Sequence, residues 1–567
     1  MRPFCPTHSP AISPASWRLP AALCLLLLAA AAVAQSDPPT ARSKPAASLF
    51  RIAGKVVNAS TGEAVSRASV AALSESDSHT VAAAESDADG HFALEGLPAA
   101  KYQLTASRRG YRTAFFDEHA EYSTAIVTGP DQDTSGLVFE LTPVAWLHGV
   151  VTGDGGDAVE DARAILFKRV HDYARSSGPA EHIIQVNSTN TDDTGAYDFD
   201  NLEPGEYYVA VSGEPWYALH RANAAGRLRA GGDSAAALDV AYPVTYYDST
   251  TEEAAATRIV LGKGSHEEAD INLHAVPALR LAVAASQRQD GSGARAELRT
   301  MAFGTEISAE STGNFDRGGR PGEQIEFSGV APGHYQMTQG DPPRTVDFDA
   351  TSSEEVDASQ GVPAVQVSGV VVSALGGPPP ENIYLTLAPL DAGRVRGPLT
   401  AFARKGEFTF AQAPQGSWEL TAQMNGTGYP VVSIATGSRA HAGGSLTIGD
   451  KPVRLVVTVA SGGTRVEGFA RKAGKGKAGA MVILVPRDLS AMHSLVRRDQ
   501  SDSDGSFSLR DAAPGEYTIV AIENAWELDW GLPQVIARYL PRGLPVTIPA
   551  GAGKSFRLPA PVEVQPR

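Results

Sequence analysis

One pattern recurs along this chain and limits the folds that the chain can adopt. It reads Gly-x-aromatic-x-apolar-x-x-apolar-x-x-Gly-x-aromatic, and its most complete copy runs from Gly195 to Tyr207. An aromatic residue followed two positions later by an apolar one has the period of a β-strand with a single buried face. The first glycine suits the positive φ of a tight hairpin turn, and the Pro-Gly pair before the last aromatic suits a second turn. The pattern therefore predicts strand, turn and strand.

Five copies of this pattern predict five similar units. The third copy, around Phe327, is degenerate and has Glu323 in place of the first glycine. Upstream of each copy lies a further predicted strand, and four of these strands carry a central glycine, which often marks a close backbone approach. Short strands with regular turn signals, in a chain with 56 glycines and 38 prolines, are typical of antiparallel sandwiches. The four central glycines are Gly54, Gly149, Gly369 and Gly468.

We therefore expect an all-β protein made of five tandem antiparallel β-sandwich modules of the prealbumin or immunoglobulin-like kind. Modules 2 and 5 carry the main insertions, and part of the module 2 insertion is rich in Ala, Arg and Gly, which fits either a short helix or a loop. The predicted modules are residues 50–143 (module 1), 144–276 (module 2), 277–363 (module 3, degenerate), 364–460 (module 4) and 461–567 (module 5).

The first 34 residues have the layout of a secretory signal peptide. Arg2 and Arg18 form a basic region, residues 21–31 form an apolar run, and Ala32-Val33-Ala34 offers a small-x-small cleavage site. Residues 35–49 are rich in proline and predict a flexible linker. We expect an exported protein, located in the periplasm, on the cell surface or outside the cell.

Removal of this segment changes the chemistry of the mature chain in two ways. Both cysteines, Cys5 and Cys24, lie in it, so no disulfide and no cysteine-based metal site is expected. The formal net charge moves from −16 to −18, because the segment holds two arginines and no acidic residue. Such a charge argues against nucleic acid as a partner. No later apolar run is long enough to predict a transmembrane segment.

The repeated pattern, together with the upstream glycine-bearing strand, resembles the carboxypeptidase regulatory-like domain. This resemblance implies a transthyretin-like or carbohydrate-binding-like β-sandwich that accompanies secreted metallocarboxypeptidases, outer-membrane receptors or bacterial surface proteins as a folding or binding accessory. The peptidase of such proteins is a separate domain. Its His-x-x-Glu zinc pair does not occur in this sequence, so no enzyme is expected.

Aromatic residues supply the candidates for a ligand site. Carbohydrate binding requires exposed flat rings on a rigid sandwich, because sugar faces stack on tryptophan and tyrosine. Trp146 and Trp418 fall on predicted strands and are expected in the cores. The other candidates follow motif strands of modules 2 and 5, where loops gather; the alternative is that they cap a core or pack between modules. The candidate ligand-binding residues are Trp216, Tyr246, Tyr247, Trp526 and Trp530.

Calcium is the one cofactor that the sequence suggests. Asp502, Asp504 and Asp511 stand at positions similar to the ligand positions of an EF-hand loop. The neighbouring Gly505 and Phe507 already belong to the β repeat, so an ordinary hairpin turn is the alternative. The hypothesis of a calcium site therefore competes with a purely structural explanation.

These observations favour a non-catalytic, exported binding or structural protein. Carbohydrate is the favoured ligand, and another extracytoplasmic protein is the second class of partner. Two alternatives stay open. One is a scaffold or spacer that binds nothing small, and the other is an accessory subunit of a peptidase or of an outer-membrane transport system.

Overall fold

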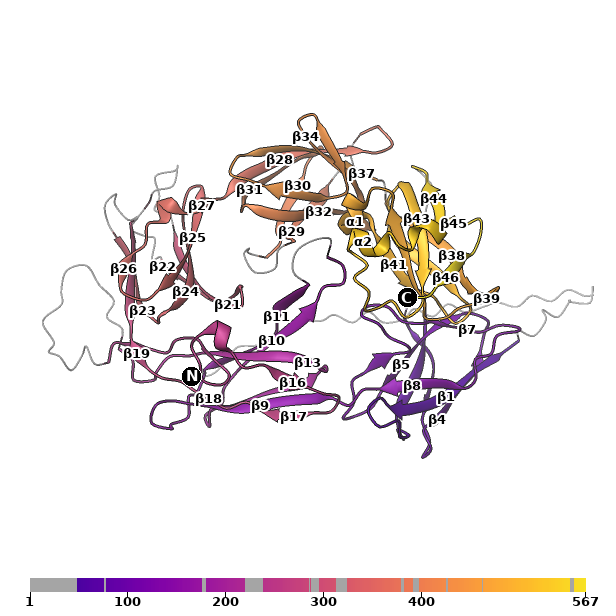
Figure 1. The fold of residues 1–567 in the computed structure, drawn as a ribbon, viewed down its shortest axis with the longest axis horizontal. Coiled ribbons are helices and arrows are strands. Elements are labelled where there is room, and N and C mark those ends of the chain that lie inside the picture. Colours follow the sequence, from indigo (N-terminus) through magenta and orange to yellow (C-terminus); the bar gives the residue numbers. More distant parts are fainter. Residues whose placement is uncertain are drawn as a thin grey trace, which may run out of the picture. The chain divides into compact units, whose positions relative to one another are not determined.

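Almost all of the regular structure in this protein is β-strand, as Figure 1 shows. The computed structural model divides the chain into two units, Met1–Ala47 and Ser48–Arg567, and the description below concerns the second. The predicted signal peptide, most of the linker, Glu323 and the centre of the module 2 insertion lie outside the described residues. These described residues are 48–567 without 76–77, 176–179, 220–237, 285, 287–294, 313–323, 379–381, 391–396, 425–426, 461 and 551–554.

Helices are few and short in the described part of the chain. The α-helices α1 (Met492–Leu495) and α2 (Pro533–Ile536) have four residues each. No helix among the described residues is both long enough and apolar enough to cross a membrane. The prediction of an all-β sandwich protein is confirmed.

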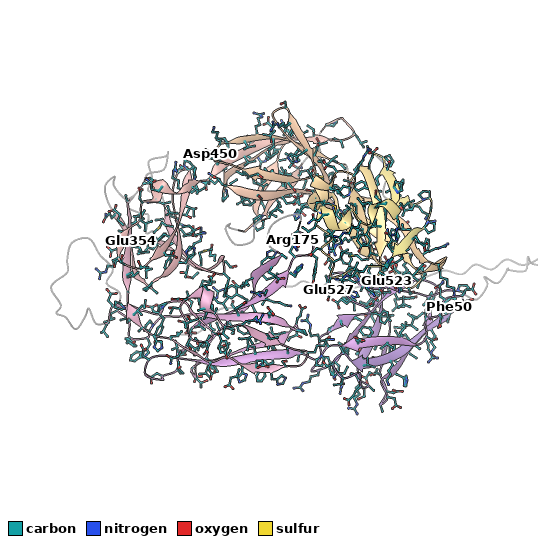
Figure 2. The ribbon with its side chains drawn as sticks, in the orientation of Figure 1. Phe50, Arg175, Glu354, Asp450, Glu523 and Glu527 are labelled. Atoms are coloured by element: carbon teal, nitrogen blue, oxygen red, sulfur yellow. The ribbon has the colours of Figure 1, made fainter. Side chains whose placement is uncertain are left out.

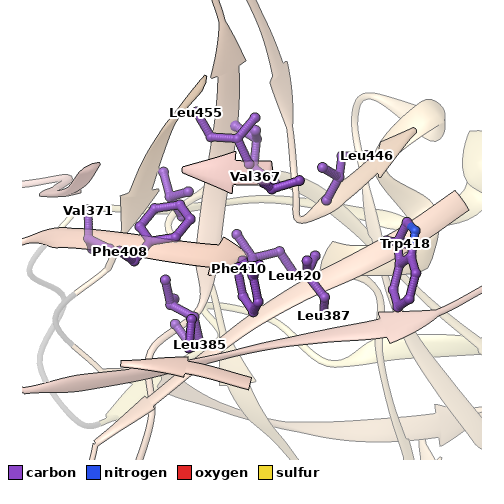
Figure 3. Close-up of a cluster of buried hydrophobic side chains, with 14 of the residues drawn as sticks. Val367, Val371, Leu385, Leu387, Phe408, Phe410, Trp418, Leu420, Leu446 and Leu455 are labelled. Carbon is purple, nitrogen blue, oxygen red and sulfur yellow. The ribbon is translucent and has the colours of Figure 1, made fainter. Parts of the chain in front are cut away.

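Buried apolar side chains of the described residues gather into separate cores. Five clusters draw their buried members from one predicted module each. Figure 3 shows the core of module 4, which contains Phe408, Phe410 and the fully buried Trp418. The exact bounds of the modules stay a prediction, and strand β19 (Val276–Pro277) runs across one of them.

One arrangement of strands recurs in every predicted module. The first strand pairs antiparallel with the first motif strand and parallel with a strand near the end of the module, which is the last strand in module 1 and β26 (Glu354–Glu355) in module 3. A second strand lies between the strand before the motif and the second motif strand. In module 1 the two sheets are β4-β1-β8 and β3-β2-β5-β6. Its strands are β1 (Phe50–Asn58), β2 (Ser69–Ser74), β3 (Thr80–Glu85), β4 (His91–Leu97), β5 (Lys101–Ser107), β6 (Ala114–Phe115), β7 (Ile126–Val127) and β8 (Leu137–Leu141).

Modules 2 and 3 repeat this plan with additional short strands. The module 2 insertion contributes β14, which pairs with β19 at the boundary between the two modules. The strands of module 2 are β9 (Ala145–Thr152), β10 (Arg163–His171), β11 (Glu181–Asn190), β12 (Ala196–Leu202), β13 (Gly205–Ser212), β14 (Val240–Ala241), β15 (Thr245–Tyr246), β16 (Ile259–Leu261), β17 (His266–Glu268) and β18 (Ile271–Asn272). Those of module 3 are β20 (Leu279–Ala284), β21 (Ala296–Ala302), β22 (Thr305–Thr312), β23 (Gln324–Val330), β24 (Gly333–Gly340), β25 (Pro343–Ala350), β26 (Glu354–Glu355) and β27 (Val362–Pro363).

Modules 4 and 5 follow the same plan, and in module 5 strand β46 connects the two sheets into one. The strands of module 4 are β28 (Val365–Ser373), β29 (Ile383–Pro389), β30 (Leu399–Ala403), β31 (Glu407–Ala413), β32 (Gly416–Met424), β33 (Thr427–Gly428), β34 (Val431–Thr436), β35 (Arg439–Ala442), β36 (Ser445–Ile448) and β37 (Val453–Val459). Those of module 5 are β38 (Thr464–Lys472), β39 (Lys475–Gly476), β40 (Met481–Pro486), β41 (Arg497–Gln500), β42 (Ser506–Ala512), β43 (Gly515–Ile522), β44 (Leu544–Ile548), β45 (Ser555–Arg557) and β46 (Val562–Gln565).

The first motif glycine has the predicted backbone conformation but a different role. Its φ is positive, with a value of 75° at Gly195, and the same holds in modules 1, 4 and 5. In module 2, however, the strands before and after it, β11 and β12, belong to different sheets. In module 2 the prediction of a hairpin is therefore wrong, because the turn carries the chain from one sheet to the other. In module 4 it is confirmed, because Arg404 and Glu407 exchange two backbone hydrogen bonds across the turn.

The central glycine of each first strand makes room for two neighbours. Gly149 lies directly opposite the motif aromatic Tyr197, and a Cβ atom on it would come within 2.1 Å of the Ala269 carbonyl oxygen. Gly54, Gly369 and Gly468 likewise lie opposite Phe92, Phe408 and Phe507. The glycine lets the aromatic ring lie across the strand and lets neighbouring chain approach closely.

The last motif aromatic makes the same hydrogen bond in all five modules. In module 2 the Tyr207 hydroxyl donates to the Glu203 carbonyl oxygen, four residues earlier, at 2.7 Å. Trp418 does the same through its indole nitrogen at 3.1 Å. This bond ties the turn between the two motif strands to the core, as in a tyrosine corner. The corresponding donors elsewhere are Tyr102, Tyr335 and Tyr517.

Candidate functional site

Trp216 is the one exposed ring among the five candidate aromatics. It follows β13, has 86% of its surface exposed, and meets Tyr217 edge to face at 5.6 Å between ring centroids. An exposed indole on a module end is the geometry that stacking on a sugar requires. The neighbouring residues 220–237 lie outside the described part of the chain.

The two tyrosines of module 2 are less exposed than Trp216. Tyr246 is 3% exposed and packs at 5.2 Å from Phe303, in a buried cluster that joins residues of modules 2 and 3. Tyr247 is partly buried against the core of module 2. We therefore correct the assignment of Tyr246 as a platform, because a buried ring offers no free face.

The tryptophans of module 5 lie in the insertion between β43 and β44, and they contact other modules. Trp526 stacks on His119 of module 1, with ring centroids 4.9 Å apart and planes at 12°. Trp530 is 4% exposed and lies under the Arg498 guanidinium, 4.3 Å from the ring centroid. These rings fill a contact between modules, so the expectation that Trp530 is an exposed platform is wrong.

Asp502 forms the central ion pair of this contact. Its carboxylate accepts a hydrogen bond from the Lys101 ammonium of module 1 at 2.6 Å and another from the Ala125 backbone N–H at 3.1 Å. Burial raises the pKa of the Asp502 carboxyl, and the Lys101 charge opposes that shift. A charge taken out of water in this way needs a partner, and Lys101 supplies it.

Polar neighbours extend the contact on both sides of this pair. The Ser503 backbone N–H donates to the Ala125 carbonyl oxygen at 2.9 Å, and its hydroxyl accepts from the Val127 N–H at 2.8 Å. The Gln500 amide donates to the Thr124 hydroxyl at 2.7 Å and also to the Asp117 carbonyl oxygen. The contact is therefore built from directed hydrogen bonds as well as from stacked rings.

The same insertion of module 5 also binds module 2. Asp529 accepts hydrogen bonds from His171 at 2.7 Å and from Arg175, labelled in Figure 2, at 2.8 Å. The Gly531 N–H donates to the Tyr173 carbonyl oxygen, and a Cβ on Gly531 would come within 2.0 Å of the Ala174 carbonyl oxygen. We call all these contacts of residues 500–503 and 526–531 with modules 1 and 2 the junction.

A polar cleft of about 510 Å³ borders the junction. Arg497, Arg498 and Arg510 line it together with Asp499, so charges of both signs face the space. Removal from solvent raises the pKa of Asp499 to about 7, although the backbone N–H groups of Ser508 and Gln500 lower it. A carboxyl with a shifted pKa in a cleft can mark a functional site, but structural networks produce such shifts too.

The three predicted calcium ligands do not come together. Asp502 is engaged with Lys101, and Asp504 accepts the backbone N–H of Ser506 at 2.8 Å within the turn. Asp511 lies at the other end of strand β42. Among the described residues no group of three or more His, Cys, Asp or Glu side chains is arranged to hold a metal ion. The calcium assignment is corrected, because Asp502 belongs to the junction, Asp504 belongs to the turn, and Asp511 lies apart from both.

Sequence reasoning missed the junction partners Lys101, His119, His171 and Arg175. Comparison of the repeats shows why the turn gave no signal. In module 2 the turn aspartate Asp192 accepts the backbone N–H groups of Thr194 and Ala196 at 2.9 Å each. In module 5 its counterpart Asp502 faces Lys101, and Asp504 takes over the turn. Module 1 has the same pair of aspartates, Asp87 and Asp89, yet there the first one accepts the backbone N–H groups of Asp89 and His91. The pair of aspartates therefore did not reveal that Asp502 has another partner.

Comparison with known proteins supports the family resemblance at the start of the chain. The carboxypeptidase regulatory-like domain family matches residues 51–142, which is nearly the whole of module 1. The resemblance is thus confirmed for that segment. No curated protein matches the chain.

Some solved structures show distant likeness to the chain. The Bacillus anthracis TIE protein is 13% identical, with a TM-score of 0.17, over 72% of this chain and 74% of its own. A streptococcal ancillary pilin is 10% identical, with a TM-score of 0.19, over 55% of this chain and 98% of its own. The shaft pilin SpaA from Lactobacillus rhamnosus GG is 9% identical, with a TM-score of 0.18, over 40% and 98%. Likeness at this level says nothing about function.

Proposed function

We propose that this protein is an exported, non-catalytic structural protein whose modules hold one another through the junction. The observation that carries the proposal is the use made of its most unusual side chains. Asp502, Trp526 and Asp529 all engage residues of other modules. These side chains connect one β-sandwich module to another, as expected in a scaffold protein.

Hydrogen exchange on a Trp526→Ala variant tests this proposal. The change removes the ring that stacks on His119, so amides of residues 119–127 should exchange faster while the core of module 1 keeps its protection. Tyr384→Ala, at a half-exposed ring of module 4, is the matched control. Unchanged exchange in residues 119–127 would contradict a structural role for the junction.

Carbohydrate binding is the second candidate function, and the exposure of Trp216 favours it. A panel of soluble glycans should bind the mature chain and lose affinity in a Trp216→Ala variant, with Tyr384→Ala again as the control. If no glycan binds, the scaffold proposal stands alone. The accessory-subunit alternative instead requires that a pull-down with the mature chain recover one defined extracytoplasmic protein.

Export is part of the proposal and has its own test. Cleavage after Ala34 should leave Gln35 as the first residue of the protein recovered outside the cytoplasm. N-terminal sequencing of that protein measures this directly. An intact Met1 in the exported fraction would rule out the cleavage.

A further inference from the structure

The outer face of one sheet in module 3 is polar, and three of its polar side chains are buried. In the sheet β22-β21-β24-β25-β27, alternate residues of the three middle strands point away from the module core. Direct cross-strand pairing places them in two rows. The first row is Arg299, Gln336 and Asp347, and the second is Glu297, Thr338 and Thr345.

Residues of module 4 lie opposite part of these rows, whereas Asp347 is exposed. Arg299, Gln336 and Thr338 are only 3%, 8% and 7% exposed although they face away from their own core. The connection between the modules is one residue long, because β27 ends at Pro363 and β28 begins at Val365. The Ala364 N–H in between donates to the Pro343 carbonyl oxygen at 2.8 Å. Such a short, hydrogen-bonded connection restricts the position of module 4 over the sheet.

A cleft of about 640 Å³ remains between the two modules. Its volume lies within the range of about 300 to 1,000 Å³ that is usual for small-molecule sites. The polar rows of module 3 form one wall. Leu399, Ala411 and Pro414 of module 4 contribute apolar surface to the opposite wall.

The polar wall carries donors and acceptors with little unbalanced positive charge. Arg299 lies between Glu297 and Glu306, with 3.0 Å from its Nε to the Glu306 carboxylate. The hydroxyls of Thr338 and Thr345 are 3.0 Å apart. Hydroxyl groups can both donate and accept, as a ligand rich in hydroxyls requires. The carboxylates disfavour an anion, and the guanidinium disfavours a cation.

We propose that this cleft binds an uncharged, hydroxyl-rich small molecule of the class of short neutral oligosaccharides. The apolar wall receives the C–H face of a sugar, and the rows of module 3 exchange hydrogen bonds with its hydroxyls. Gln336, between Arg299 and Asp347, is the central contact of the wall. The cleft is separate from Trp216 and from the junction, so this proposal can be tested independently of both.

Calorimetric titration of the mature chain with maltotriose, cellotriose, diacetylchitobiose and trigalacturonate tests the proposal. At least one neutral sugar should bind, and the acidic trigalacturonate should not. Thr345→Val removes one hydroxyl without changing the shape of the side chain, and Gln336→Leu removes the central amide. Each change should weaken binding about tenfold, which corresponds to about 1.4 kcal/mol. Thr436→Val, at an exposed position of module 4, should leave binding unchanged.

Two further variants keep the test decisive. Thr400→Trp places a large ring at the exposed rim of the cleft and should abolish binding even if Gln336→Leu fails to fold. In a Trp216→Ala background, Thr345→Val and Thr400→Trp should weaken the sugar binding that remains, which separates the cleft from the exposed-ring site. The proposal is overturned if none of the neutral sugars binds, if trigalacturonate binds more tightly than they do, or if Thr345→Val and Thr400→Trp bind like the wild type.

Discussion

At the scale of single residues, the repeat is a set of structural devices. The last motif aromatic donates a hydrogen bond to a carbonyl four residues earlier in every module, including the degenerate third one, where Tyr335 reaches Ala331. The central glycine of the first strand leaves space for an aromatic ring and for neighbouring chain. Residues that stand out in the sequence thus have a role in packing before any role in binding.

Removing a single hydroxyl tests the first device. Tyr207→Phe deletes the donor to the Glu203 carbonyl while the ring stays in the core. The free energy of opening in module 2 should fall by about 1 kcal/mol, the usual net value of a buried neutral hydrogen bond. Native-state hydrogen exchange of β13 amides measures this value. Tyr384→Phe, at a half-exposed ring, is the control, and an equal loss there would contradict the assignment.

Adding a single methyl group tests the second device. Gly149→Ala would bring a Cβ within 2.1 Å of the Ala269 carbonyl oxygen and within 2.8 Å of the Tyr197 hydroxyl. We expect module 2 to lose about 1 to 3 kcal/mol, as overpacked cores do. Thermal unfolding and the hydrogen exchange of β9 amides measure this loss of stability. Gly449→Ala, where nothing lies within 4 Å of the added atom, should have little effect.

At the scale of elements, the alternation of apolar residues located most strands, because it indicates which face of a strand is buried. The two strands that the pattern predicts between Gly195 and Tyr207, for example, correspond to β12 and the start of β13. The same alternation does not indicate which strand pairs with which. The parallel pairing of first and last strands could therefore not be predicted from it. Trp146 shows the limit for a single residue. We expected it in a core, but it lies half-buried on the outer face of β9 and stacks on His148 at 4.6 Å.

The insertion between β43 and β44 supplies a prediction on pH. Hydrogen bonds to Asp529 and then Glu181 raise the pKa of His171, and the bond from His171 lowers the pKa of Asp529. The ion pair therefore stabilises the junction fully below the unfolded histidine pKa of about 6.5 and loses this effect as pH rises through the raised pKa. At low pH, the contribution of Asp529 to stability is present above the unfolded aspartate pKa of about 3.9. It is lost as pH falls through the lowered pKa of Asp529.

An NMR titration of the His171 ring checks this prediction. Its midpoint should lie above the ordinary histidine value in the wild type and should fall in an Asp529→Asn variant, because the largest cause of the shift is then removed. Asp161→Asn changes an exposed carboxylate elsewhere in module 2 and should leave the midpoint unchanged. Equal midpoints in all three proteins would show that the ion pair does not form in solution.

At the scale of the whole described chain, the junction joins segments that are far apart in sequence. Lys101 and Asp502 are 401 positions apart, and no local pattern couples them. Composition can show that an insertion contains tryptophans, but it cannot show what covers them. From the sequence, Trp526 and Trp530 were candidates for a ligand-binding platform or for packing between modules. The sequence alone could not distinguish these two roles.

Reversing the charges of the central pair tests the junction as a unit. Lys101→Asp and Asp502→Lys, made singly, should each cost on the order of 2 kcal/mol of local stability, between the values for exposed and buried pairs. The double variant should recover part of that loss. Hydrogen exchange at Ala125 and Val127, whose N–H groups bond to Asp502 and Ser503, measures both effects. Two additive single effects, with no recovery, would argue against a direct pair.

The parallel pairing of first and last strands also bears on mechanical strength. In module 4, β28 and β37 run side by side through seven paired positions, from Val367 with Val453 to Ser373 with Val459. Tension applied to the two ends of such a module would pull these neighbours lengthwise in opposite directions. The hydrogen bonds between them would then bear the load together instead of opening one after another. A chain built from sandwiches of this kind is suited to resist stretching along its length.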